Sequence, residues 1–155
     1  MRKNGFTLIE LLIVITILVT VLSLGIASFT TFNRRERLKQ TALTLKSYLR
    51  FSQTKAISAQ KPLSGCTTYT GMHISFTSTS YSMQHQCSPE GVVGIAESIA
   101  LPSGITFSPV PSAFTFLTRS NTDTIVTDRT VLLTNGTLNY TLVISPNGSV
   151  RVTGF

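Results

Sequence analysis

The chain has 155 residues, a formal net charge of +7 and an apolar fraction of 42%, which is ordinary for a globular protein. This length allows one folded domain together with an extension. The positive charge does not indicate a nucleic-acid-binding domain, because eight of the thirteen basic residues lie between residues 34 and 61 and the remainder of the chain beyond them is close to neutral.

The N-terminus combines a short basic segment with a long apolar one. Residues 1–5, Met-Arg-Lys-Asn-Gly, form a basic leader, and residues 6–32 contain Glu10 as their single charge. An apolar stretch of this length is long enough to cross a hydrocarbon core of about 30 Å, and a helix satisfies its own backbone there. The sequence therefore predicts a transmembrane helix over residues 6–32.

An amphipathic pattern follows over residues 33–61, where no proline interrupts the chain before Pro62. Small and apolar residues recur at alternating spacings of four and three, which is the period of one helix face. The stripe consists of Leu38, Ala42, Leu45, Leu49, Ser52, Ala56 and Ala59. We expect one continuous helix, with a basic outer face on this arm, that ends at the Lys-Pro-Leu-Ser-Gly segment at 61–65.

Residues 62–155 show strand patterns separated by turn residues. A hairpin is predicted from residues 71–76 and 81–86, and weaker strands at 95–101, 105–107 and 114–117. Asn-Gly pairs at 135–136 and 147–148 separate three further runs and predict a C-terminal β-meander. The expected fold class is α+β, with a long N-terminal helix packed on a small antiparallel β domain.

The two cysteines, Cys66 and Cys87, lie in this β-rich part. Beyond a membrane segment the oxidising side is the natural location, so a disulfide is the favoured interpretation and two free buried thiols are the alternative. His73 and His85 lack the spacing of zinc ligands and are interpreted as ordinary strand residues. Neither a metal nor a cofactor is expected, and no catalytic constellation suggests an enzyme.

The order of the N-terminal segments separates two kinds of leader. A secretory signal peptide places its small-residue cleavage site after the apolar run, whereas Gly5 precedes it here. The segment from Lys3 to Leu12, Lys-Asn-Gly-Phe-Thr-Leu-Ile-Glu-Leu-Leu, resembles the class III signal of type IV pilins and type II secretion pseudopilins. The resemblance implies that a prepilin peptidase cuts between Gly5 and Phe6, that the new amine of Phe6 is N-methylated, and that the helix is then extracted into a filament.

Glu10 is the expected assembly residue. A carboxylate in hydrocarbon costs a few kcal/mol, so such a residue is a functional candidate by default. The positive amine of Phe6 lies about one helical turn away within the same chain, and the resemblance implies pairing with the Phe6 amine of a neighbouring subunit. This pair would fix the axial register, because a slip leaves two unpaired charges.

Two segments resemble the GspH/FimT group of minor pilins and pseudopilins: residues 49–57 at the end of the arm and residues 143–152 at the final hairpin. Some members bind DNA through a basic Gly-Arg-x-Arg turn, but the corresponding segment here is Gly-Ser-Val-Arg and keeps only Arg151. One arginine releases few counterions, so a solvated strand residue is the favoured interpretation. A major pilin and a DNA-binding or adhesive tip subunit are the alternatives.

The resemblance also implies partners and a location. The expected partners are prepilin peptidase, other pilin subunits, an inner-membrane assembly platform and, before assembly, membrane lipid. The expected location is the bacterial inner (cytoplasmic) membrane, crossed once with the C-terminal domain outside the cytoplasm, and afterwards the filament.

Overall fold

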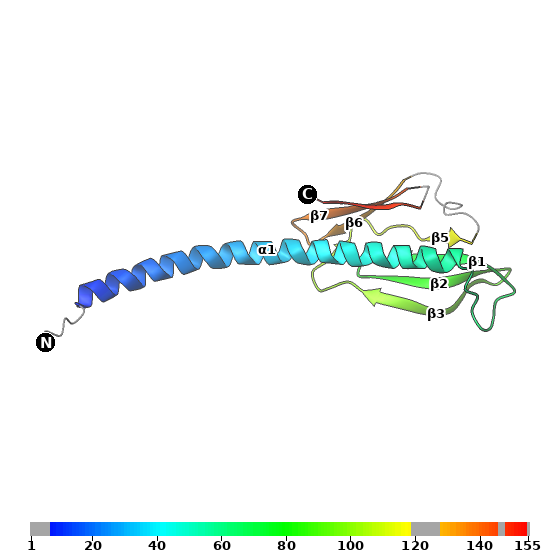
Figure 1. The fold of residues 1–155 in the computed structure, drawn as a ribbon, viewed down its shortest axis with the longest axis horizontal. Helices are drawn as coiled ribbons and strands as arrows, with labels where there is room; N and C mark the ends of the chain where they lie inside the picture. Colours follow the sequence, from blue (N-terminus) through cyan, green and yellow to red (C-terminus); the bar gives the residue numbers. More distant parts are fainter. Residues whose placement is uncertain (1–6, 119–127, 146–147, 155) are drawn as a thin grey trace. The chain divides into compact units, whose positions relative to one another are not determined.

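The computed structural model describes residues 7–118, 128–145 and 148–154, and it divides into two compact units, Met1–Glu36 and Arg37–Phe155. One helix, α1, spans Leu8–Ile57 (Figure 1). The strands are β1 Thr68–Phe76, β2 Ser80–Ser88, β3 Gly91–Ala100, β4 Thr106–Phe107, β5 Phe114–Leu117, β6 Arg129–Thr134, β7 Asn139–Ile144 and β8 Val150–Gly154. The sequence-based fold class, a long helix on an antiparallel β domain, is confirmed.

The helix ends earlier than its amphipathic pattern predicts. The last turn of α1 closes with a bond from the Ser58 N–H to the Thr54 carbonyl at 2.9 Å. Ala59 then takes a left-handed conformation with φ 49°, and its N–H bonds the Ala56 carbonyl at 3.1 Å. A left-handed residue directly after the last turn is a common way to end a helix. The expected helical arm to residue 61 is thus shortened by a local turn.

The β domain contains two four-stranded antiparallel sheets. The first has the order β3-β2-β1-β5 and the second the order β4-β6-β7-β8. The predicted hairpin is confirmed, since β1 pairs with β2 in antiparallel register from Phe76 opposite Tyr81. The C-terminal meander is confirmed as well, because β6, β7 and β8 pair in sequence. β3 begins at Gly91, four residues before the predicted start at 95.

The amphipathic stripe of the arm forms the core of the 37–155 unit. Leu38, Ala42, Leu45, Leu49, Ser52 and Ala56 are all fully buried. They join residues from both sheets in one cluster, among them Ile74, Leu133 and Leu142. Figure 1 shows this part of α1 running along both sheets. The arm and the β domain therefore form one unit, whereas the sequence pattern divides them at residue 61.

Two stripe and core assignments are wrong. Ala59 is exposed because the helix has already ended. The sequence favours a core position over a binding surface for five aromatic residues: Tyr48, Phe51, Phe107, Phe114 and Phe116. Phe51 is instead 47% exposed, whereas the other four are buried. The Lys55 ammonium lies 4.6 Å from the centre of the Phe51 ring, so the ring faces a cation rather than the core.

We expect Leu45→Ala to lower the free energy of unfolding by about 2–5 kcal/mol, because a fully buried leucine leaves a cavity when it is truncated. Leu43→Ala is the matched control, since Leu43 lies on the same helix and is 46% exposed. Its effect should stay near or below about 0.5 kcal/mol. Urea unfolding of the full chain in mild detergent measures both, and equal losses for the two variants would contradict this packing.

Candidate functional site

The helix of the Met1–Glu36 unit has apolar side chains on every side. Twelve large apolar residues between Leu8 and Leu22 are each at least 48% exposed. An amphipathic helix that covers one side of a globular core would show a polar face, whereas a helix that is apolar all round is buried in a core, a bundle or a membrane. The side chains of this segment are not covered by other side chains of the Met1–Glu36 unit among the residues that the structure describes, so they favour an apolar environment.

The hydroxyl groups in this apolar helix are bonded to its own backbone. The Thr16 hydroxyl donates to the Ile13 carbonyl at 2.8 Å, and the Thr20 hydroxyl donates to the Ile17 carbonyl at 2.8 Å. The Ser23 hydroxyl donates to the Thr20 carbonyl at 2.8 Å. Such back-bonding satisfies a hydroxyl without water. These three side chains are thus compatible with an apolar environment, and Glu10 stands out as the group that is not.

Glu10 lies in the first turn of α1, directly after a helix cap. The Thr7 hydroxyl oxygen accepts the Glu10 N–H at 3.3 Å, and the Leu11 N–H bonds the Thr7 carbonyl at 3.2 Å. A carboxylate in the first turn also interacts favourably with the positive end of the helix dipole. Thr7 caps the helix and Glu10 remains exposed, so its carboxylate is accessible to a partner.

Sequence reasoning overlooked Thr7. Its signal is the spacing Thr-x-x-Glu at residues 7–10, which is the pattern of a helix capping box directly before an apolar run. The structure shows the threonine half of this motif, the bond from the Glu10 N–H to the Thr7 hydroxyl. The cap fixes where the helix starts and so fixes the position of Glu10 in the first turn. The predicted cleavage site, Gly5 and Phe6, lies outside the described residues.

The two cysteines are joined. Cys66 and Cys87 form a disulfide with their Cα atoms 5.5 Å apart, which confirms the favoured interpretation. Cys66 lies between α1 and β1, and Cys87 lies in β2. Glu90 also links these two segments, because its carboxylate accepts two hydrogen bonds from Thr67, the residue after Cys66. One comes from the Thr67 N–H at 3.0 Å and the other from the Thr67 hydroxyl. These bonds hold the pKa of the Glu90 carboxyl below its usual value.

We expect the double variant Cys66→Ser, Cys87→Ser to lose about 3 kcal/mol of stability, since the bridge closes a loop with a sequence separation of 21 residues. Urea unfolding of the full chain with and without reductant measures independently how much the same disulfide contributes to the free energy of unfolding. Reduction should lower the stability of the wild-type chain and leave the double variant unchanged. A wild-type chain insensitive to reductant would contradict a stabilising role.

A polar group connects the arm to β3 in the first sheet. The Tyr48 hydroxyl donates to the Glu97 carbonyl at 2.7 Å, and the Lys55 ammonium lies 3.8 Å from the Glu97 carboxylate. Burial, and secondarily the charge of Glu97, raises the pKa of Tyr48. Burial, and secondarily the charge of Lys55, lowers the pKa of His85. The tyrosine and the histidine are therefore neutral at neutral pH, and this group serves to hold the helix on the sheet.

The other histidine, His73, lies in the first sheet. His73 lies in β1, where its Nδ1 is 3.1 Å from the Thr115 hydroxyl, and burial lowers its pKa. His85 lies in β2. Across the described ranges, no group of three or more His, Cys, Asp and Glu residues is arranged to hold a metal ion.

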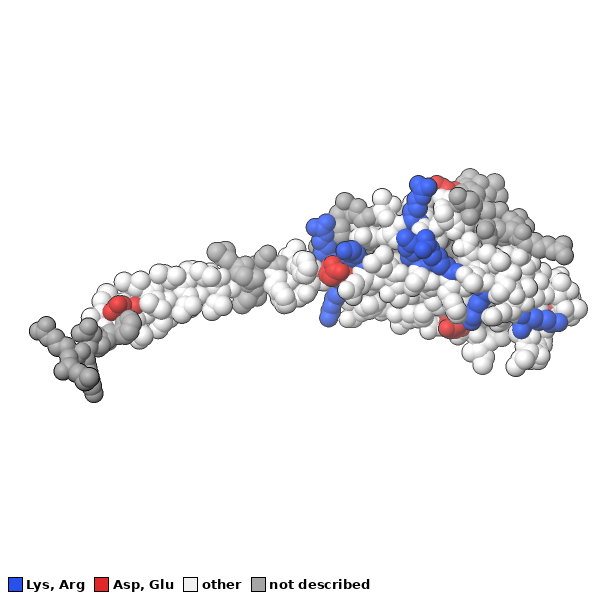
Figure 2. Space-filling model, viewed as in Figure 1, with Lys and Arg blue, Asp and Glu red and all other residues white. Residues whose placement is uncertain are grey.

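The basic residues of the arm remain on the surface. In the view of the 37–155 unit in Figure 2, Lys and Arg side chains gather along the course of α1, and acidic side chains are fewer. Arg151 is exposed in β8, where it pairs with Val143 of β7. The predicted turn before it, at Asn147, lies outside the described residues. The structure thus places Arg151 on an edge strand and does not test whether it contacts DNA.

Comparison with known proteins identifies the N-terminal segment. Residues 1–26 match the family described as the prokaryotic N-terminal methylation motif. No curated protein and no solved structure matches the chain. Among the residues that the structure describes, no helix is both long and apolar enough to cross a membrane.

The matched motif is the signal of a type IV pilin-like subunit that is processed by prepilin peptidase, is anchored at the membrane and assembles with other pilin subunits. It covers both the predicted cleavage site and Glu10. The structure adds a helix of 50 residues, α1, whose second part packs on two antiparallel sheets. The chain carries the N-terminal signal of the type IV pilin and pseudopilin family, and its long helix packed on an antiparallel β domain gives it the α+β architecture of a pilin.

Proposed function

We propose that this protein is a structural subunit, a minor pilin or pseudopilin of the GspH/FimT type, in a type IV pilus-like or type II secretion filament. The observation that carries the proposal is the all-round apolar helix, whose large side chains from Leu8 to Leu22 are at least 48% exposed. Packed among the same helices of other subunits, these side chains leave water, and each Å² of apolar surface buried contributes about 25 cal/mol. Assembly is therefore a state in which this apolar helix is removed from water.

Glu10 supplies the specificity of that assembly in the proposed mechanism. Cleavage after Gly5 frees the amine of Phe6, and this amine carries a positive charge near the start of the helix. In a bundle of apolar helices the Glu10 carboxylate of one subunit pairs with the Phe6 amine of its neighbour. Removing one member of a buried pair costs about 3–5 kcal/mol, so a helix in the wrong register is strongly disfavoured.

Before assembly, we propose that residues 6–32 hold the subunit in the inner membrane as a single pass. The exposed apolar side chains and the internally bonded hydroxyls of Thr16, Thr20 and Ser23 support this stage. The Cys66–Cys87 disulfide supports an oxidising location for the β domain. Arg2 and Lys3 stay on the cytoplasmic side, in agreement with the usual bias of positive charge.

The experiment is to shear filaments from the cells that make the protein and to quantify each subunit by mass spectrometry. The chain should be recovered in the filament fraction, and in amounts well below those of the most abundant subunit. Its absence from filaments, together with full recovery in the membrane fraction, would contradict the filament role. An amount equal to that of the most abundant subunit would make it a major pilin.

A further inference from the structure

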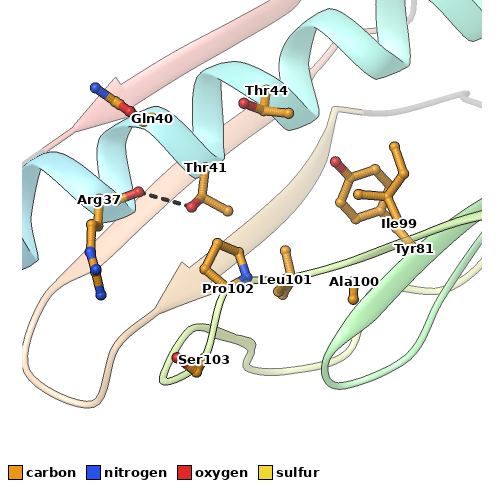
Figure 3. Close-up of a pocket in the computed structure, with 10 residues that line it drawn as sticks. All are labelled: Arg37, Gln40, Thr41, Thr44, Tyr81, Ile99, Ala100, Leu101, Pro102 and Ser103. Atoms are coloured by element: carbon orange, nitrogen blue, oxygen red, sulfur yellow. Dashed lines mark hydrogen bonds between the residues drawn. The ribbon is translucent and has the colours of Figure 1, made fainter.

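The 37–155 unit contains a surface cavity between the arm of α1 and the segment that leaves β3. It has a volume of about 560 Å³, within the range of about 300–1,000 Å³ that is usual for small-molecule sites. Figure 3 shows the residues that line it, from the helix on one side and from β2, β3 and the following loop on the other. They are Arg37, Gln40, Thr41, Thr44, Tyr81, Ile99, Ala100, Leu101, Pro102 and Ser103.

The inner part of the cavity is apolar. Tyr81 is 2% exposed and Leu101 is 9% exposed, and Ile99 packs against the core cluster beside them. In Figure 3, Leu101 and Pro102 lie opposite the helix, and Tyr81 and Ile99 lie at one end of the group. This surface favours a hydrocarbon chain over a fully hydrated ion, because apolar contact displaces water at a gain proportional to the area covered.

The rim is polar and positively charged. Arg37 is the one charged residue among the described residues that line the cavity. Figure 3 shows its side chain extending from the helix toward the level of Pro102 and Ser103. The Thr41 hydroxyl donates to the Arg37 carbonyl at 2.8 Å, so this lining hydroxyl is satisfied by the backbone of its own helix. A guanidinium matches a phosphate with two parallel hydrogen bonds.

A cation at the rim and an apolar inner surface together fit a molecule with a phosphate group attached to hydrocarbon. We propose that this cavity binds an anionic phospholipid, with the phosphate on Arg37 and the adjoining hydrocarbon on Leu101 and Pro102. The proposal rests on the proposed function, in which the subunit is held at a membrane before assembly. Arg37 follows Phe32, the end of the predicted apolar segment, by five residues, which places it where headgroups would be encountered. In this proposal, the bound lipid orients the subunit at the membrane before the subunit is extracted into the filament.

The test uses the full chain in a neutral detergent and counts bound lipid by native mass spectrometry. Phosphatidylglycerol should bind at one site at least about tenfold more tightly than a diacylglycerol with the same acyl chains, because the charge-assisted hydrogen bonds between the phosphate and Arg37 are lost when the phosphate is absent. Glycerol 3-phosphate should not bind at the same concentration. Equal binding of the two lipids would overturn the headgroup assignment, and equal binding of glycerol 3-phosphate would identify a plain phosphate site instead of a lipid site.

Three variants locate the binding. Arg37→Gln should weaken phosphatidylglycerol about tenfold or more, and Thr44→Trp should weaken it similarly by filling the cavity without changing the charge. Arg50→Gln is the matched control, an exposed arginine of the same helix outside the cavity, and should stay within about twofold. Unchanged thermal unfolding of each variant shows that its fold is intact.

Equal losses for Arg37→Gln and Arg50→Gln would overturn the proposal, since they indicate attraction to the basic arm as a whole. Filament incorporation is measured separately on the same variants. A chain that assembles but binds no phosphatidylglycerol contradicts the lipid site alone. A chain that binds the lipid at this cavity but is never found in filaments contradicts the proposed function and leaves the lipid site standing.

Discussion

Replacement of Gly5 by leucine is expected to abolish removal of the leader. In the proposed processing, the peptide bond after Gly5 enters the active site of the peptidase, where glycine lets a second backbone approach closely and a side chain would collide. We expect the amount of mature chain to fall at least about a hundredfold, as a misplaced scissile bond commonly costs. The mobility of the chain on a denaturing gel, read against the uncut precursor, measures this.

Two controls accompany this prediction. Gly5→Ala adds a single methyl group and should be cut more slowly than the wild type but faster than the leucine variant. Asn4→Leu places the same bulk one residue earlier and should be cut far better than Gly5→Leu. If Gly5→Leu loses its leader at the wild-type rate, the bond after Gly5 is not the processing site.

Glu10→Gln is expected to be processed normally and to fail at assembly. Glutamine keeps the shape of the side chain and removes its charge, so in the proposed filament the Phe6 amine of the neighbouring subunit is left unpaired among apolar helices. An unpaired buried charge costs about 3–5 kcal/mol, which corresponds to a loss of incorporation of more than about a hundredfold. The ratio of mature chain in the filament fraction to that in the membrane fraction measures it.

The matched control for Glu10 is Thr7→Ala. This change removes the cap whose hydroxyl oxygen accepts the Glu10 N–H, and it costs about 1 kcal/mol of helix stability without touching the carboxylate. Incorporation should therefore fall only about fivefold or less. If Thr7→Ala fails as completely as Glu10→Gln, the helix start and not the charge determines assembly.

The helix arm, over residues 33–61, is the part of the fold that the sequence predicts best. Leu38, Ala42, Leu45, Leu49, Ser52 and Ala56 repeat with the helix period, and all six are buried. Local periodicity reports a buried face because every member of the face lies on one element. Ala59 continues the period but lies beyond the end of the helix, and a period alone does not reveal where a left-handed residue stops it.

The arrangement of the β domain was predicted only in part. The hairpin of β1 with β2 and the meander of β6 to β8 join strands that are close in sequence, and their turn residues are visible. The pairing of β1 with β5 brings Ile74 opposite Phe114, forty residues later, and no local pattern encodes it. The division into two sheets depends on such long-range pairs. The sequence therefore predicts most of the strands but not which strands share a sheet.

The residues of the candidate site also differ in how far the sequence alone reveals them. Glu10 stands out in the sequence as a lone charge in an apolar run, because charge is a property of single residues. Thr7 needs the pairing of two positions to be noticed, and the cavity at Arg37 needs Leu101 and Pro102, which lie more than sixty residues away. Phe51 was assigned to the core because aromatic residues usually lie there, whereas its ring faces Lys55 at the surface.

We propose that one cut after Gly5 both removes the leader and creates the positive charge with which Glu10 pairs. The most direct test is the intact mass and N-terminal sequence of the chain recovered from purified filaments. We expect a chain that begins with N-methylated Phe6 and retains the whole apolar helix. Filaments that contain the chain with Met1 still attached, or with an N-terminus beyond the apolar segment at residue 32, would contradict it.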